Sequence, residues 1–125
     1  MCYKDNMCYD YEIFNEIFDI CEQYNFEYLD EYIDKDNEPY IKIEFIGSFK
    51  SYVREDFDNR FDYYRTTEKI VNENIQPWFD KCWNTIKDYN IFENWDWDYE
   101  DYPCYYLNLK KDIAEKVLNG ELKKI

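Results

Sequence analysis

The stretch ENWDWDYED, residues 93–101, combines five carboxylates with three aromatic rings and contains no lysine or arginine. In an extended chain, alternate side chains point to opposite sides. The aromatic side then consists of Trp95, Trp97 and Tyr99, and the acidic side of Asp96, Asp98 and Glu100. We expect the rings to anchor the strand on a core and to hold the carboxylates outward. Such a strand is either an edge strand whose charges discourage aggregation, or a ridge that faces a protein partner with a Trp or Tyr as hot spot.

A second acidic row lies on the helix that the sequence predicts over residues 8–24. Glu12, Glu16 and Asp19 fall on one ridge about 10 Å long, from a rise of ~1.5 Å per residue. A DNA duplex presents one charge per ~1.7 Å of its axis. The row is therefore either a solvated helix face or a set of carboxylates that can occupy phosphate-binding sites of another protein. The candidate partner-binding residues are Glu12, Glu16, Asp19, Glu93, Trp95, Asp96, Trp97, Asp98, Glu100 and Asp101.

The charge of the whole chain favours the partner-facing interpretation of both rows. The formal net charge is −14 over 125 residues, and residues 5–34 contain ten acids and no base. A field of this sign repels nucleic acid and anionic membranes and attracts basic surfaces. We therefore expect a basic nucleic-acid-binding protein as the partner, and neither direct nucleic-acid binding nor membrane binding.

The residue types that enzymes use most are missing from the sequence. It has no histidine, so neither a Ser-His-Asp nor a Cys-His nucleophile can be built. It has two glycines and no C-x-x-C pair, which disfavours a phosphate-binding loop and a zinc site. The segments 34–38 and 96–101 are similar to calcium loops but lack the required glycine and terminal Glu. We expect no enzymatic activity, no cofactor and no metal, with a carboxylate-dependent metal-binding enzyme as the alternative.

The cysteines and the N-terminal segment bear on the compartment. Five cysteines form no paired framework, and Met1 is followed by polar and acidic residues. No apolar run approaches the ~18 residues of a membrane span. The sequence therefore predicts a cytoplasmic protein with reduced thiols.

The first half of the chain is expected to form a helix and a hairpin. Over residues 8–24, apolar side chains recur every three or four residues, and Asp10 suits the N-cap. Residues 40–46 alternate as a strand, and residues 34–39 have the composition of a turn. Residues 26–33 fit either a strand or a helix, and we expect a strand that pairs with 40–46 as a hairpin. Residues 51–65 either extend the sheet or begin a helix.

The second half is expected to add helices and two strands. Thr66 and Thr67 have the pattern of a helix start, and Pro77 suits the first turn of a further helix over 77–89. The apolar stripe of that helix is predicted to contain Trp78, Phe79, Cys82, Ile86 and Tyr89. Strands are expected at 93–99 and 104–109, followed by a helix over 111–119 that stops at Gly120. The predicted fold is α+β, a single domain over 1–125. Its small antiparallel sheet (hairpin 26–46 plus strands near 93–109) packs with the N-terminal helix and two or three further helices.

In size, acidity, aromatic content and lack of catalytic residues, the chain resembles phage-encoded inhibitors that imitate nucleic acid, of which anti-CRISPR proteins are the best-known group. The 15 tyrosines agree with this, because tyrosine is favoured in protein interfaces. The resemblance implies a non-enzymatic inhibitor that occludes the basic nucleic-acid channel of a CRISPR-Cas effector in the host cytoplasm. The alternatives are an immunity protein or antitoxin that neutralises a basic nuclease toxin, and a structural phage protein.

Overall fold

The computed structural model describes residues 12–46, 56–98 and 104–122. They form an α+β fold whose four-stranded antiparallel sheet has the order β1-β2-β4-β3, which confirms the predicted class. The elements in chain order are α1 (Glu12–Gln23), β1 (Phe26–Tyr32), β2 (Tyr40–Phe45), α2 (Arg60–Ile70), the π-helical turn η2 (Val71–Ile75), α3 (Gln76–Ile86), the 3-10 turn η3 (Lys87–Tyr89), β3 (Phe92–Asp98), β4 (Cys104–Leu109) and α4 (Lys111–Leu118). None of the helices in these ranges is long and apolar enough to cross a membrane.

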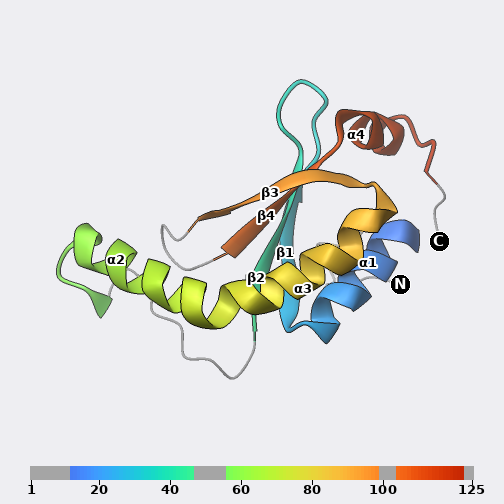
Figure 1. Ribbon diagram of the computed structural model, residues 1–125. Helices are drawn as coiled ribbons and strands as arrows, with labels where there is room; N and C mark the ends of the chain where they lie inside the picture. Colours follow the sequence, from blue (N-terminus) through green and yellow to red (C-terminus); the bar gives the residue numbers. More distant parts are fainter. Residues whose placement is uncertain (1–11, 47–55, 99–103, 123–125) are drawn as a thin grey trace.

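The sheet has one face packed against helices, which we call the inner face, and an opposite outer face. Figure 1 shows α1 and α3 on the same side of the sheet, with α2 extending away from it. Side chains on the inner face are buried, among them Phe26, Ile41, Ile43, Tyr105 and Leu107. Among the strands that the structure describes, β1 and β3 each pair with one neighbour, so the acidic strand β3 lies at an edge of this sheet.

The helix α1 and the hairpin β1–β2 confirm the prediction for the first half of the chain. The buried residues of α1 are Phe14, Ile17, Phe18 and Cys21, spaced three or four apart. Asn25 has a φ of 67°, a conformation that asparagine tolerates, and it turns the chain directly from α1 into β1. Residues 8–11, including the expected cap Asp10, lie outside the described residues.

A continuous helical run over α2, η2, α3 and η3 precedes β3, and its start differs from the predicted one. The helix begins at Arg60, where Asn59 Oδ1 accepts a hydrogen bond of 2.8 Å from the backbone N–H of Asp62. The prediction that Thr66 and Thr67 begin a helix is therefore wrong. Thr67 lies inside α2 and is buried, because it follows buried Tyr63 by one helical turn. Of the segment that the sequence left open, residues 60–65 are helical.

Pro77 lies in the first turn of α3, as expected, and the π-helical turn η2 directly precedes this helix. A proline cannot donate to the carbonyl four residues earlier, and its ring excludes a regular turn there. The missing hydrogen bond and the bulk of the ring account for the wider, π-helical turn η2 before Pro77. Phe79, Cys82 and Ile86 form the buried stripe of α3 as predicted. Trp78 does not belong to it: the side chain is 41% exposed, and Lys81 Nζ lies 4.9 Å from the centre of its ring.

Aromatic rings from both halves of the chain meet in the core between α3 and the sheet. Phe79 stacks on Tyr105 with ring centres 3.9 Å apart, and its ring meets Trp95 at 4.7 Å and Phe26 at 5.6 Å. Such ring pairs contribute about 0.5–1.5 kcal/mol each beyond the burial of apolar area. The core thus joins α3 to β1, β3 and β4.

The helix α4, which follows β4, ends at a glycine. Gly120 has a φ of +71°. Its N–H donates to Val117 O, and the N–H of Glu121 donates to Lys116 O at 2.8 Å. These two bonds are the pattern of a Schellman cap, so the predicted end of the helix at Gly120 is confirmed.

Candidate functional site

The outer face of the sheet collects polar and charged side chains from all four strands. The strand registers place them in cross-strand rows. The row nearest the β1–β2 turn consists of Tyr32, Tyr40, Asn108 and Asn94, and the next row of Asp30, Lys42, Tyr106 and Asp96. Beyond them lie the pairs Glu27–Glu44 and Cys104–Asp98. Segments far apart in the sequence thereby contribute to one surface.

The carboxylates of this surface, which we call the sheet-face acids, are Glu27, Asp30, Glu44, Asp96 and Asp98. Asp30 and Asp96 are exposed, and the other three are half-buried. Lys42 is the one basic side chain among the outer-face positions described here. The sequence pointed to Asp96 and Asp98 through the alternation in β3. It did not point to the acids of β1 and β2, because only strand pairing brings them to the same face.

A β-bulge decides which residues of β1 belong to the outer face. The register shifts between Tyr28 and Asp30. Strict alternation from buried Tyr28 would place Asp30 and Tyr32 on the inner face. The extra residue Leu29 moves both to the outer side, opposite Lys42 and Tyr40.

The tryptophans of β3 support the acidic strand from the core, as the sequence predicted. Trp95 and Trp97 are half-buried and pack against the hydrophobic core. Trp97 lies 6.5 Å from the Tyr105 ring, measured between ring centres. Both point to the inner face, and Asp96 and Asp98 point to the outer one. A partner on the sheet-face acids would therefore meet tyrosine rings rather than these tryptophans.

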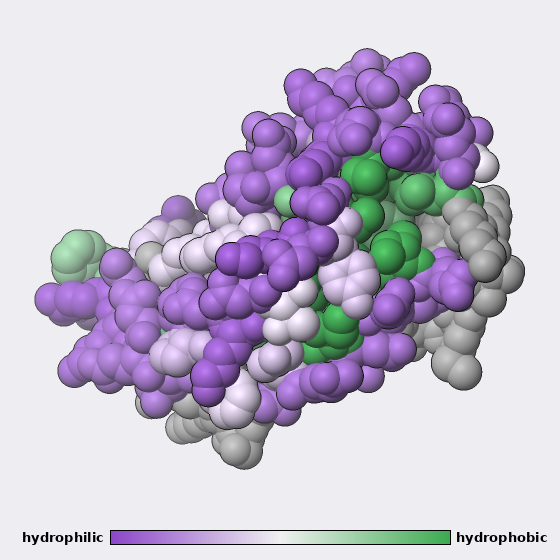
Figure 2. Space-filling view, turned by 45° about the vertical axis from the view of Figure 1, so that its right-hand side comes forward, coloured by the Kyte–Doolittle hydropathy of each residue, from purple (hydrophilic) through white to green (hydrophobic). Residues whose placement is uncertain are grey.

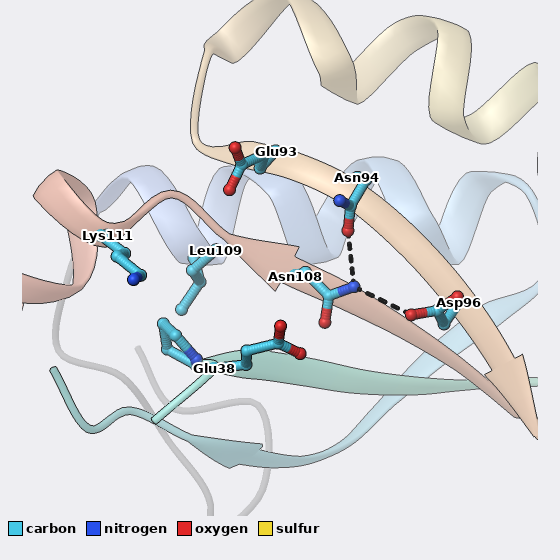
Figure 3. A pocket seen from close by; sticks show the side chains of 8 residues that line it. Glu38, Glu93, Asn94, Asp96, Asn108, Leu109 and Lys111 are labelled. Carbon is cyan, nitrogen blue, oxygen red and sulfur yellow. Dashed lines mark hydrogen bonds between the residues drawn. The ribbon is translucent and has the colours of Figure 1, made fainter. Parts of the chain in front are cut away.

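Glu93 lies at one end of the outer face, in a hollow between the β1–β2 turn, β3 and α4. The hollow has a volume of about 130 Å³ and is lined by Glu38, Pro39, Glu93, Asn94, Asp96, Asn108, Leu109 and Lys111. Figure 3 shows Asn108 at its centre, where Nδ2 donates to Asn94 Oδ1 at 2.6 Å and to Asp96 Oδ2 at 3.4 Å. The Asn108 amide thus lies between Asn94 and Asp96 and contacts one exposed carboxylate of the sheet-face acids.

The predicted acidic row on α1 is present, but it does not lie on the outer face of the sheet. Glu12, Glu16 and Asp19 are all exposed, on the side of α1 opposite its buried residues. Tyr89 donates a hydrogen bond of 3.3 Å to Glu16 Oε1. Burial raises the pKa of Tyr89, and the charge of Glu16 adds to this shift.

The surface around the α1 row is partly apolar. Glu12 and Glu16 border a shallow hollow of about 260 Å³ together with Ile13 and Leu122. Figure 2 shows an apolar patch below α4 on a surface that is otherwise largely hydrophilic. The row therefore borders an apolar surface, unlike the largely polar outer face of the sheet.

The structure thus does not bring the two predicted acidic rows together. Because α1 packs on the inner face, its exposed ridge points away from the sheet, and the sheet-face acids point in the opposite direction. A single flat partner surface can engage one row or the other. Glu100, Asp101 and Tyr99 lie outside the described residues.

The described side chains offer little for metal or thiol chemistry. Within the described ranges, no three Cys, Asp or Glu side chains are arranged so that they could hold a metal ion. Cys21 and Cys82 are buried with their sulfurs 3.8 Å apart. The contact with Cys82 and burial raise the pKa of the Cys21 thiol, and burial raises that of Cys104. The thiols of Cys21 and Cys104 are therefore held in the protonated form and are poor nucleophiles.

Comparison with known proteins gives no relative: no protein-family model, curated protein or solved structure matches this chain.

Proposed function

We propose that this protein is a non-enzymatic inhibitor that binds the basic nucleic-acid-binding surface of another protein and takes the place of the nucleic acid. The class of target we propose is a CRISPR-Cas effector. The observation that supports this most is the outer face of the sheet, where five carboxylates and one lysine lie on one rigid surface. The proposal places the protein in the cytoplasm of the host cell, where such effectors work.

The charge of the outer face suits a surface that normally holds phosphates. Four strands spaced by ~4.8 Å span about 14 Å. The five sheet-face acids and Lys42 leave four negative charges on that width. A duplex of the same length carries about eight. The face therefore has about half the charge density of a duplex, and the net charge of −14 adds a long-range attraction to basic surfaces.

The rigidity of the outer face matters as much as its charge. Association costs less free energy when the binding groups are already held in place. The strands are fixed from behind by the ring cluster of Phe79, Tyr105 and Trp95. A nucleic-acid mimic needs this support, because flexible carboxylates would lose conformational entropy on binding.

Competition with nucleic acid tests the proposal. Purified CRISPR effectors are mixed with a labelled target duplex, and the protein is added at low and at moderate salt. We expect displacement of the duplex and loss of cleavage, weakening as salt rises because charged contacts are screened. We also expect inhibition to decline in steps as sheet-face acids are changed to amides.

Two results would contradict the proposal. In the first, addition of the protein at low salt leaves duplex binding and cleavage unchanged for every effector. The other is inhibition that a single amide substitution abolishes completely, since that pattern indicates a specific catalytic or metal-binding carboxylate.

A further inference from the structure

The outer face also carries a row of tyrosine rings that the acids alone do not explain. We call Tyr32, Tyr40 and Tyr106, from β1, β2 and β4, the tyrosine ladder. Tyr32 and Tyr40 are stacked with ring centres 6.0 Å apart, and Tyr40 meets Tyr106 edge-on at 5.1 Å. Tyr32 at the open end is 43% exposed. The ladder thus offers aromatic surface to a partner on the same face as the carboxylates.

The tyrosine ladder already holds one cation. Lys42 Nζ lies 5.5 Å from the centre of the Tyr106 ring. A cation within ~6 Å of a ring centre is attracted by the negative face of the ring. Among the described residues, no other lysine or arginine lies over a ring of the ladder. Tyr32, which stacks on Tyr40 and is 43% exposed, presents the same kind of ring surface at the open end.

Carboxylates are fixed beside the outermost ring. The Tyr32 hydroxyl donates to Asp34 Oδ2 at 3.2 Å. Asp34 also accepts bonds from the Asp36 backbone N–H at 2.9 Å and from Asn37 Nδ2 at 3.0 Å. These bonds, led by the one from Asp36, lower the pKa of Asp34. Asp30 lies two residues before Tyr32 on the same strand, so their Cα atoms are about 7 Å apart. The Asp30 side chain is exposed.

This combination fits a guanidinium better than an ammonium group. A guanidinium is planar and stacks on an aromatic ring, and its edge can donate two parallel hydrogen bonds to a carboxylate. An ammonium group is a compact, strongly hydrated charge that gains less from a ring.

We propose that Tyr32 and Tyr40, with Asp30 and Asp34, form a docking site for an arginine of a basic protein partner. The arginine stacks on the exposed ring surface and pairs with one of the two carboxylates. This inference rests on the proposed function, because it names the side chain through which the basic partner docks.

Two peptides of equal charge test the inference: fluorescently labelled octa-arginine and octa-lysine, titrated with the protein at low salt and followed by anisotropy. We expect octa-arginine to bind more tightly. Tyr32→Leu should reduce the preference for arginine by about two- to fivefold, the value of one exposed cation–π contact. Tyr32→Phe should keep the preference, because it keeps the ring. The matched control is Trp78→Leu, which removes a similarly exposed ring, 41% exposed, on α3; it should leave the preference unchanged.

The outcomes separate this inference from the proposed function. Circular dichroism and thermal unfolding confirm that each variant is folded. If Tyr32→Leu leaves the arginine preference at the wild-type value, or if Trp78→Leu reduces it equally, the docking site is refuted and the proposed function stands. If neither peptide binds at low salt, the attraction to basic partners fails, and the proposed function fails with it.

Discussion

Replacing Phe79 by leucine tests whether the aromatic core supports the acidic strand. Phe79 is fully buried and contacts three rings, those of Tyr105, Trp95 and Phe26. Leucine keeps most of the apolar volume but removes the ring pairs, each of which contributes about 0.5–1.5 kcal/mol. We expect the free energy of unfolding to fall by about 2–4 kcal/mol, and the melting temperature by roughly 10 °C in a chain of this size.

Urea unfolding followed by tryptophan fluorescence measures this loss, because Trp95 lies against the altered side chain. The matched control is Phe61→Leu, the same substitution at a side chain that is 69% exposed, which should cost less than about 0.5 kcal/mol. Amide hydrogen exchange in Phe92–Asp98 should accelerate more than in α1, because β3 is an edge strand that loses a contact from behind. A loss below about 1 kcal/mol, or equal losses for both variants, would refute the claim that this ring cluster supports β3.

Three further predictions concern pH, a helix start and a helix end. Burial raises the pKa of Tyr105 and raises that of Tyr106 to about 12. Tyrosines in the unfolded chain have a pKa of about 10, so the stabilisation from these two residues is complete below that pH and is lost as the pH rises towards their folded pKa values. Thermal unfolding should therefore show stability that falls above about pH 10, and the fall should be less steep in Tyr105→Phe. Asn59→Ala should cost about 1 kcal/mol in urea unfolding, because it removes the bond to the Asp62 N–H, and Asn59→Ser should recover most of it. Gly120→Ala should cost about 1 kcal/mol through its positive φ alone, since an added Cβ meets nothing within 4 Å; Gly120→Asn should cost less, and equal losses would point to another cause.

Elements with a strong local pattern could be predicted from the sequence. The apolar spacing of α1, the alternation in β2 and β3 and the glycine after α4 each depend on residues close together in the chain. The predicted start of α2 at Thr66 and Thr67 is wrong: threonine is a common N-cap residue, but the side chain that caps this helix is that of Asn59. Thr66 and Thr67 lie inside α2 instead, where Thr67 is buried.

The outer face could be predicted only in part, for two physical reasons. The order β1-β2-β4-β3 pairs β2 with β4, which lies about 60 residues later, and no local pattern encodes that choice. The bulge at Leu29 then reverses the facing of Asp30 and Tyr32, so simple alternation would have placed both in the core. The sequence therefore indicated one acidic strand, and strand pairing made it an acidic face with a tyrosine ladder.

Two variants with equal charge test most directly whether the outer face is the nucleic-acid mimic. One carries Asp30→Asn, Glu44→Gln and Asp96→Asn on the sheet, and the other carries Glu12→Gln, Glu16→Gln and Asp19→Asn on α1. Each removes three negative charges, so long-range attraction changes equally and only position differs. The measurement is displacement of a labelled duplex from a CRISPR effector. We predict that the sheet variant loses about tenfold more potency than the helix variant, at about 0.5 kcal/mol per charged contact. Equal potency of the two variants would contradict the proposal, because the negative charge would then act without regard to the face that carries it.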